Sequence, residues 1–384
     1  LDAMRALVVG GSGLLGRQLV EAFRGQGHEV QGTACTRVKN GLIQLDVYDT
    51  EKVSQLFVEF QPQVVVLSTN EQRESEAEKQ ASASDMDVSH IAQIARLATA
   101  AGSWILYVSC DTVFGGSQDR KMPFSPSDSV CPCTAAAAHK VACESKLVEA
   151  TGGDCGILRV PVLYGPLEKI GESPITVLTK IIFPRVKSGE EVDGTTKRFP
   201  AHTRDVARMC VLLSEIRARA GKEVKGKWHF GALHPEDQNG WTDWDVVQMI
   251  AGFLRVELES QGVCQLVKKE EADPTMLRLD GEDLMNLLKQ HDLSFGEVKS
   301  LQDGLEEVLT ALIPAAALGL SRQDNPPLSE NSKRPVEIHT SDGQKIKVKD
   351  SAAALVKQAC NKLSVGKFKE AIEAMTQAIK IDSN

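Results

Sequence analysis

The sequence predicts an α/β fold: a Rossmann-like doubly wound parallel sheet with a smaller C-terminal substrate lobe and a short helical C-terminal extension. Apolar, β-branched runs alternate with helical segments through the first 160 residues. A glycine-rich turn joins the first run to the first helix. The run at 63–67 (QVVVL) is continuously apolar after its first residue, which is typical of a parallel strand buried on both faces.

The expected elements follow in regular order. Strands are predicted at 5–9, 28–33, 63–67, 104–109 and 155–160, and helices at 17–24, 50–60, 88–101 and 135–150. Because parallel neighbours need a crossover, usually a helix, this order builds consecutive βαβ units. After Pro161 the alternation loosens and polar insertions appear, which indicates a smaller lobe near the carboxyl ends of the strands.

Composition divides the chain into four segments. We expect residues 1–160 to form the Rossmann domain and 161–320 the smaller lobe. Residues 321–335 are expected to be a linker, because the stretch is polar, contains two adjacent prolines and has no apolar periodicity. Residues 336–384 are expected to carry a hairpin followed by a pair of helices.

The C-terminal segment has its own pattern. Loose alternation at 336–348, with Asp342-Gly343 at its centre, predicts the hairpin, and helices are predicted at 352–363 and 367–381. The last helix resembles part of a tetratricopeptide repeat. One repeat is not a stable array, so three interpretations stay open: packing on the main body, a longer array, or an unrelated helical hairpin.

Composition and charge exclude several classes of function. The chain has 384 residues, of which 42% are hydrophobic and 25% charged, so collagen-like and wholly disordered classes are excluded. With 44 basic and 52 acidic residues the net charge is -8, which argues against nucleic acid or anionic membrane as a partner. No apolar run reaches the roughly 18 residues of a membrane span.

The nine cysteines show no pairing rhythm. Five of them, Cys35, Cys110, Cys143, Cys155 and Cys210, lie in apolar or small-residue runs, which suggests burial in a reducing, cytoplasmic compartment. The Cys131-Pro-Cys133 pair has no second Cys or His pair nearby, so no metal site is predicted. The chain begins with Leu1, which leaves open an earlier targeting segment.

The turn at residues 10–16 (GGSGLLG) is the clearest motif. It follows a predicted strand and opens a predicted helix, which is the setting of a dinucleotide-binding turn. Gly10 permits the tight turn, Gly13 lets a pyrophosphate approach the backbone, and Gly16 lets the helix pack on the strand. The N–H groups at the helix N-terminus would face the phosphates.

The segment after the second strand, CTRVK at 35–39, is basic and has no carboxylate. A cation here pairs with a 2′-phosphate, so Arg37 favours NADP over NAD, the alternative being a solvated basic loop. Asp46 is expected either to contact the adenine or to cap the next helix. The predicted cofactor contacts are Gly10, Ser12, Gly13, Leu14, Leu15, Gly16, Thr36, Arg37, Asp46, Val47, Ser68, Lys140 and Leu163.

These motifs resemble the extended short-chain dehydrogenases/reductases. The matching stretches are GGSGLLGR at 10–17, YVSCDTVFGG at 107–116, LRVPVLYG at 158–165 and RFPAHTRDVA at 198–207. The resemblance spans about residues 4–310. Within the family the chain is similar to dTDP-4-dehydrorhamnose reductases and, more closely, to the regulatory β subunits of methionine adenosyltransferase, which implies an NADP-binding body in S-adenosylmethionine biosynthesis and one-carbon metabolism.

The chain departs from this family at its catalytic acid. The reductases use a Tyr to protonate a carbonyl, a Lys four residues later to lower the pKa of that phenol, and a Ser or Thr hydroxyl to polarise the carbonyl. Here Lys140 is present, but Ala136 stands four residues before it. The hydroxyl position is Cys110, with Ser109 beside it. The resemblance therefore implies a degenerate catalytic set of Lys140, Cys110 and Ser109.

Substitute acids are few. His139 lies about 100° around the helix from Lys140, Tyr107 is expected in the core, and Tyr164 is expected near the nicotinamide end. None of them has the spacing of the missing Tyr. In the substrate lobe Asp273 stands where the sugar reductases carry an Arg, which disagrees with a nucleotide-sugar, although Arg278 follows closely.

The resemblance implies the methionine adenosyltransferase catalytic subunit as partner. In that family an aromatic and basic C-terminal tail docks on the partner, whereas residues 309–320 (LTALIPAAALGL) contain no aromatic anchor. The C-terminal helical pair is a second candidate surface, for a peptide partner. Three functions stay open: a catalytically impaired NADP-binding regulator, an active NADP-dependent reductase of a nucleotide-sugar-like carbonyl, and a partner-binding scaffold that has lost the cofactor.

Overall fold

The computed structural model describes residues 3–39, 41–69, 88–117, 122–168, 170–182, 191–254, 267–269, 276–312, 336–339 and 345–348. The linker expected at 321–335, the helices expected at 352–381 and Asp273 lie outside these residues.

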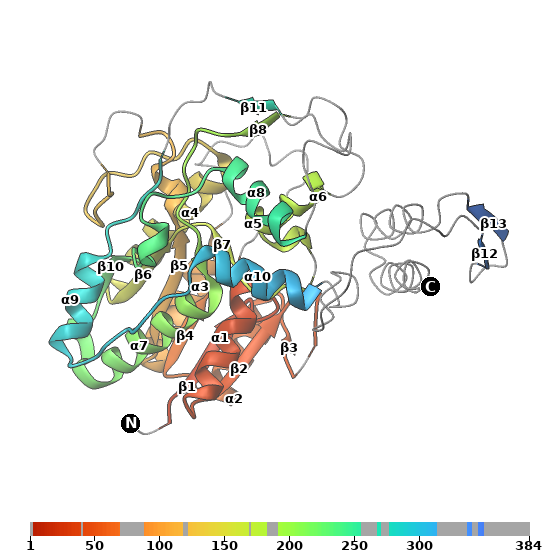
Figure 1. Ribbon diagram of the computed structural model, residues 1–384. Coiled ribbons are helices and arrows are strands. Elements are labelled where there is room, and N and C mark those ends of the chain that lie inside the picture. The colour runs from red at the N-terminus through yellow and green to blue at the C-terminus, as the bar shows by residue number, and fades with distance from the viewer. Residues whose placement is uncertain are drawn as a thin grey trace.

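A seven-stranded parallel sheet forms the centre of the molecule (Figure 1). Its strands are β1 (Arg5–Val9), β2 (Glu29–Ala34), β3 (Ile43–Gln44), β4 (Val64–Leu67), β5 (Trp104–Cys110), β6 (Cys155–Val160) and β10 (Gly226–His229). Their order is β10-β6-β5-β4-β1-β2-β3, and every neighbouring pair is parallel. The strand order reverses between β1 and β4, which confirms the doubly wound Rossmann-like prediction.

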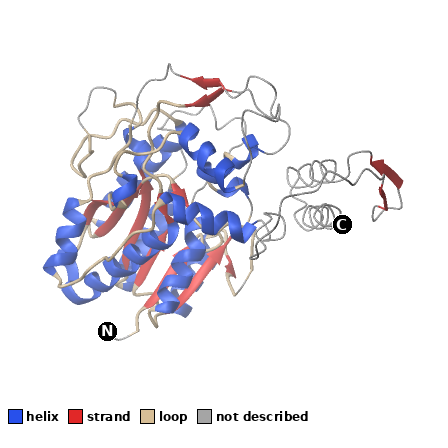
Figure 2. Ribbon diagram, in the orientation of Figure 1, coloured by secondary structure: helices blue, strands red, loops and turns tan. Residues whose placement is uncertain are grey.

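Helices cover both faces of the sheet (Figure 2). The helices α1 (Leu14–Gly25), α7 (Thr203–Ala220) and α9 (Glu282–Gln290) pack on one face, and α2 (Thr50–Phe60), α3 (Ser89–Ala101) and α4 (Ala135–Thr151) pack on the other. Alternate residues of β1 supply the two cores: Val8 joins the cluster with Phe23 of α1, and Leu7 joins the cluster with Ile94 of α3.

Side chains at the helix starts explain where the helices begin. The carboxylate of Asp49 accepts the backbone N–H of Lys52 at 3.1 Å and caps α2. The hydroxyl of Thr134 accepts the N–H of Ala137 at 3.2 Å and caps α4. The cap of α2 is therefore Asp49 rather than Asp46, so the alternative role expected for Asp46 is wrong.

A smaller cluster of elements forms a second core beyond the sheet. It contains β7 (Leu163–Tyr164), α5 (Pro174–Val177), α6 (Thr179–Ile182), β8 (Glu191–Asp193), α8 (Asp243–Phe253) and α10 (Leu301–Leu312). Strand β9 (Ala201–His202) pairs with β7, and β11 (Val267–Lys269) pairs with β8. Buried Tyr164, Ile175, Val247 and Leu305 pack together there. The chain also returns to the sheet after residue 160, because α7 packs against α1 and β10 pairs with β6.

Strands β12 (Val336–His339) and β13 (Lys345–Val348) pair antiparallel, as the hairpin predicted at 336–348 requires, and its expected turn at Asp342-Gly343 lies outside the described residues. Among the helices that the structure describes, none has both the length and the apolar character needed to cross a bilayer.

A buried ion pair ties α4 to the sheet. Arg159 of β6 is 0% exposed, and its Nε and Nη2 donate to the Glu144 carboxylate at 3.0 and 2.7 Å. Its Nη1 lies 3.4 Å from His229 Nε2, and His229 Nδ1 lies 2.9 Å from the carbonyl oxygen of Phe124. Burial lowers the pKa of His229 to about 4. The ring is therefore neutral at pH 7, and its Nδ1–H donates to that carbonyl.

The first crossover depends on close backbone contact at Gly16. A Cβ on this residue would lie 2.0 Å from the carbonyl oxygen of Gly10 and 2.9 Å from the Cα of Gly11. Both neighbours are backbone atoms that cannot rotate away. The helix therefore sits on the turn at a distance that only glycine allows, as the motif predicts.

We expect Gly16→Ala to lower the free energy of unfolding by roughly 2–4 kcal/mol, because the added methyl must push α1 away from the turn. Gly25→Ala in the same helix is the matched control, since a Cβ there meets nothing within 4 Å. The control should raise the free energy of unfolding by about 0.5 kcal/mol. Urea denaturation measures both, and equal midpoints for the two variants would contradict the steric argument.

Candidate functional site

The glycine turn forms an open cradle at the start of α1. Gly10 has φ +90°, and its carbonyl oxygen accepts the N–H of Gly13 at 3.0 Å. The first intrahelical bond runs from the N–H of Arg17 to the carbonyl of Gly13 at 3.1 Å. The N–H groups of residues 14–16 therefore precede the helical bonding pattern and stand at the positive end of the helix. Ser12 and Leu14 are half-buried, whereas Leu15 is buried beneath the turn.

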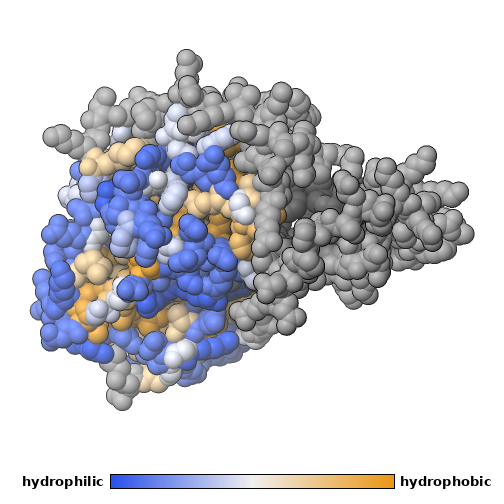
Figure 3. Space-filling model, in the orientation of Figure 1, coloured by the Kyte–Doolittle hydropathy of each residue, from blue (hydrophilic) through white to orange (hydrophobic). Residues whose placement is uncertain are grey.

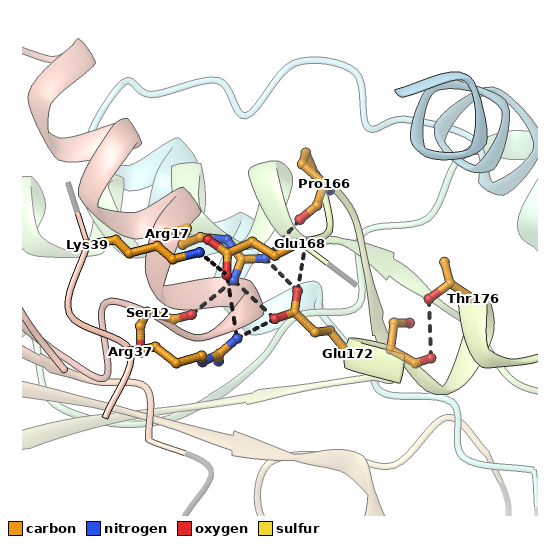
Figure 4. A network of polar contacts seen from close by, with 9 residues as sticks. Ser12, Arg17, Arg37, Lys39, Pro166, Glu168, Glu172 and Thr176 are labelled. Atoms are coloured by element: carbon orange, nitrogen blue, oxygen red, sulfur yellow. Dashed lines mark hydrogen bonds and ion pairs between the residues drawn. The ribbon is translucent and has the colours of Figure 1, made fainter. Parts of the chain in front are cut away.

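Arg37, the residue expected to meet a 2′-phosphate, lies in a charge cluster (Figure 4). Its Nη1 donates to Glu172 Oε1 at 2.5 Å and lies 3.7 Å from Glu168 Oε2. Lys39 Nζ lies 3.9 Å from the same Glu168 oxygen. Thr36 beside it is exposed. The basic loop is therefore not simply solvated, because carboxylates from the segment after β7 engage it.

Arg17 forms the other side of this cluster. Its Nη2 donates to Glu172 Oε2 at 2.8 Å and to the Pro166 carbonyl at 3.2 Å, and its Nη1 donates to the Ser12 carbonyl at 2.9 Å. One arginine thus links the glycine turn, the start of α1 and the lobe segment. Sequence reasoning assigned roles to neither Arg17 nor Glu172, since the contact spans 155 residues of chain.

The remaining predicted contacts surround the same edge of the sheet. Ser68, which follows β4, donates its hydroxyl to the Val9 carbonyl at 3.0 Å. Val47 is buried in the core beside β1, and Asp46 Oδ1 accepts the N–H of Tyr48 at 3.1 Å. Leu163 lies on β7, where its carbonyl accepts the Ser173 hydroxyl at 2.7 Å. Val9 and Ser68 lie at or just past the carboxyl ends of neighbouring strands, where ligands of such sheets bind.

The predicted catalytic positions 136 and 140 both lie on α4. Lys140 Nζ donates to the backbone carbonyls of Thr69 at 3.1 Å and Val108 at 3.5 Å. Ala136 is an exposed residue in the first turn of α4. A methyl group carries no proton to transfer. The structure therefore offers no proton donor at the position where the family places its phenol.

Cys110 and Ser109, the two candidates for the position of the family's hydroxyl group, differ in environment. The Cys110 thiol is 2.9 Å from the Thr112 hydroxyl. Burial raises its pKa although that hydrogen bond and the nearby Lys140 charge lower it, so the thiol stays protonated at neutral pH. The Ser109 side chain is buried, and its hydroxyl oxygen makes no hydrogen bond to any residue that the structure describes.

The substitute acids are held elsewhere. Tyr164 is 0% exposed, donates to the Ser300 carbonyl at 2.9 Å, and burial raises the pKa of its phenol far above the usual value. Tyr107 is also buried, and its ring lies under Lys140 with Nζ 5.1 Å from the ring centre. His139 lies against Cys143, with Nδ1 3.7 Å from Sγ. Tyr164 and Tyr107 are packing residues, as expected for Tyr107.

One acidic residue at this end of the sheet was missed. Asp111 directly follows Cys110 and is 7% exposed. Burial raises its pKa to about 7, against the opposing charge of Arg198 and hydrogen bonds from the backbone. The carboxyl group therefore exchanges a proton near neutral pH. Its burial depends on tertiary packing, so the sequence carries no direct signal for it.

The cysteines follow the expectation only partly. Cys143, Cys155 and Cys210 are buried free thiols, and Cys110 is half-buried. Cys35 is exposed, so its predicted burial is wrong: it lies past the end of β2, in the exposed basic loop. Cys131 and Cys133 are exposed free thiols. Within the described ranges, no cluster of His, Cys, Asp and Glu has the geometry to hold a metal ion.

These residues fit a dinucleotide phosphate. A glycine-rich turn leads into the N-terminus of α1, and Arg17, Arg37 and Lys39 place positive charge beside it. Backbone N–H groups and guanidinium groups are the donors that phosphates bind best. The carboxylates of Glu168 and Glu172 offset part of that charge.

The chain is similar to curated relatives and to solved structures. Methionine adenosyltransferase 2 subunit beta of Danio rerio is 33% identical over 59% of this chain and 68% of its own, and that of Rattus norvegicus is 32% identical over 60% and 67%. The dTDP-4-dehydrorhamnose reductase of Bacillus anthracis in complex with NADP has a TM-score of 0.60 at 18% identity, over 81% of this chain and 99% of its own.

A UDP-glucose 4-epimerase of Thermotoga maritima, solved with UDP-glucose, has a TM-score of 0.63 at 18% identity, over 80% of this chain and 99% of its own. At this identity the likeness shows the fold alone. Residues 4–309 match the family described as the RmlD substrate binding domain. The chain therefore belongs to the RmlD-like family of short-chain dehydrogenases/reductases, and its curated homologues are beta subunits of methionine adenosyltransferase 2.

Proposed function

We propose that this protein is an NADP-binding, catalytically impaired, reductase-like regulatory subunit of a methionine adenosyltransferase. The observation that carries the proposal is the contrast between the two ends of the site. The phosphate end has its glycine turn and its cations, whereas Ala136 occupies the position of the catalytic phenol. A protein built this way is expected to hold the dinucleotide without turning over a carbonyl substrate.

The choice of NADP rests on the loop after β2. Arg37 is the residue expected to meet a 2′-phosphate, and residues 35–39 carry no carboxylate that would bind a ribose 2′-hydroxyl. When bound, NADP would place its pyrophosphate against the turn at residues 10–16. Lys140 would lie toward the nicotinamide end, where no phenol remains for it to activate.

The partner follows from the names of the relatives. Those proteins are called beta subunits of methionine adenosyltransferase 2, and the matched regions cover about two thirds of each. On the face seen in Figure 3, hydrophobic patches alternate with hydrophilic areas. Such scattered patches are ordinary on protein surfaces and do not mark an interface. The peptide-binding role of the C-terminal helical pair stays a prediction.

We place the protein in the cytoplasm, which suits the seven free thiols among the described residues.

We expect isothermal titration of the full chain to show binding of NADP and NADPH tighter than that of NAD. Arg37→Ala should weaken NADP binding by about tenfold and change NAD binding little, because a charge-assisted bond to the 2′-phosphate is lost. Lys146→Ala is the control, since this lysine lies on α4 and pairs with Glu149 rather than with the Arg37 cluster. Absence of binding to any dinucleotide would refute the proposal.

We expect the full chain to co-elute with a methionine adenosyltransferase catalytic subunit in size-exclusion chromatography, because its relatives are named as subunits of that enzyme. The catalytic subunit run alone sets the reference volume. S-adenosylmethionine synthesis, followed with and without the chain, reports on regulation. Two separate peaks at micromolar concentration, with unchanged synthesis, would count against the partner.

A second candidate is an NADP-dependent reductase with a displaced acid, which the buried, protonatable Asp111 favours. We expect no loss of NADPH absorbance with dTDP-4-dehydrorhamnose, because Ala136 cannot protonate the carbonyl. Turnover that falls as pH rises through about 7, as Asp111 ionises, and that is lost in Asp111→Asn, would support the reductase instead. Glu149→Gln, an exposed carboxylate on α4, is the control.

A further inference from the structure

The carboxylate of Glu172 lies between two arginines at the phosphate end of the site (Figure 4). Arg17 approaches one oxygen at 2.8 Å and Arg37 the other at 2.5 Å. The Glu172 side chain is only 5% exposed. The guanidinium group of Arg37, which is expected to bind the 2′-phosphate, is therefore already paired with an anion.

Glu172 is ionised at neutral pH. Burial acts to raise its pKa, but hydrogen bonds from Arg17, from the backbone N–H of Glu168 and from Arg37 outweigh burial and hold the pKa below its usual value. A second negative group brought to Arg37 would meet this charge at short range. Two anions that share one cation repel each other, and the repulsion is strongest where water is excluded.

The contacts around Glu172 also allow the Arg37 side chain to move away from it. Without it, the Glu172 carboxylate still accepts from Arg17 at 2.8 Å and from the Glu168 N–H at 3.0 Å. Arg37 is 38% exposed, whereas Arg17 is 19% exposed and also bonds the carbonyls of Ser12 and Pro166. Arg17 is therefore the anchored partner of Glu172, and Arg37 is the partner that can turn toward a ligand.

We propose that Glu172 is an internal counter-anion that competes with the 2′-phosphate of the cofactor for Arg37, and so limits how strongly the site prefers NADP over NAD. This inference rests on the proposed binding of NADP. It assigns Glu172 as a specificity-determining residue contributed by the segment after β7 rather than by the glycine turn or the loop after β2. Glu168, at 3.7 Å from Arg37 and 33% exposed, contributes less.

The competition also connects the cofactor to the lobe. Glu172 ends the short helix η4 (Ile170–Glu172), directly before Ser173, whose hydroxyl donates to the Leu163 carbonyl at 2.7 Å and caps α5. When the 2′-phosphate takes Arg37, the lobe segment keeps its contacts with Arg17 and loses the one with the loop after β2. NADP and NAD should therefore leave residues 166–173 in different states.

Calorimetric titration of the full chain and of Glu172→Gln tests the proposal. The amide keeps the shape of the side chain and removes its charge. We expect NADP to bind Glu172→Gln about threefold to tenfold more tightly than wild type, with NAD unchanged. Adenosine 2′,5′-bisphosphate and AMP, which lack the nicotinamide half, should show the same contrast. Glu168→Gln is the control and should give a smaller gain.

Equal or weaker NADP binding by Glu172→Gln would overturn the proposal, as would an equal gain for NADP and NAD. A weaker affinity would mean that Glu172 positions Arg37 for the phosphate. In case the variant does not fold, the wild-type chain supplies a second measurement. Hydrogen–deuterium exchange in residues 166–173 should increase more with saturating NADP than with saturating NAD, and identical exchange would overturn the competition.

The outcomes separate the two proposals. If wild type binds NADP and Glu172→Gln gains nothing, the competition fails and the proposed function stands. If wild type binds no dinucleotide and Glu172→Gln binds NADP, the proposed function fails and the competition stands. If neither binds, both fail.

Discussion

The close approach of α1 to the glycine turn is the constraint on which the rest of the structure depends. With the Gly10 carbonyl in the place where a Cβ of residue 16 would lie, the first helix returns tightly over β1. That packing brings Phe23 of α1 and Met209 of α7 into one core on this face of the sheet. It also places the N-terminus of α1 and the side chain of Arg17 at the carboxyl edge, where the lobe segment contacts them.

The charge cluster at this edge balances two requirements. A phosphate site needs positive charge, but Arg17, Arg37 and Lys39 held together without anions would repel one another. Glu168 and Glu172 relieve that repulsion and join the lobe to the sheet domain. In the proposed complex with NADP, the same carboxylates would compete with the ligand phosphate. Affinity for a phosphate and contact between the lobe and the sheet thus draw on the same guanidinium group.

The fold was predictable because its signals are local. Continuous apolar runs such as 64–67, the glycine turn and the helical spacing each depend on a few neighbouring residues, and the observed sheet agrees with them. For the candidate site, only the features that depend on neighbouring residues in the sequence could be predicted. The pairing of Arg37 with Glu172 joins residues 135 apart, and the protonatable state of Asp111 depends on burial. The predicted burial of Cys35 was wrong for a similar reason, because its exposure depends on where the chain leaves β2.

The retention of Lys140 beside Ala136 has a structural explanation that needs no catalysis. Its ammonium group donates to the carbonyls of Thr69, just past the end of β4, and of Val108 in β5, and it lies over the ring of Tyr107. It therefore ties α4 to β5 and to the segment that follows β4, next to the point where the strand order reverses. An ammonium group that donates to two backbone carbonyls stabilises this edge of the sheet. Lys140 therefore has structural contacts that do not depend on a phenol at position 136, where the exposed Ala136 stands.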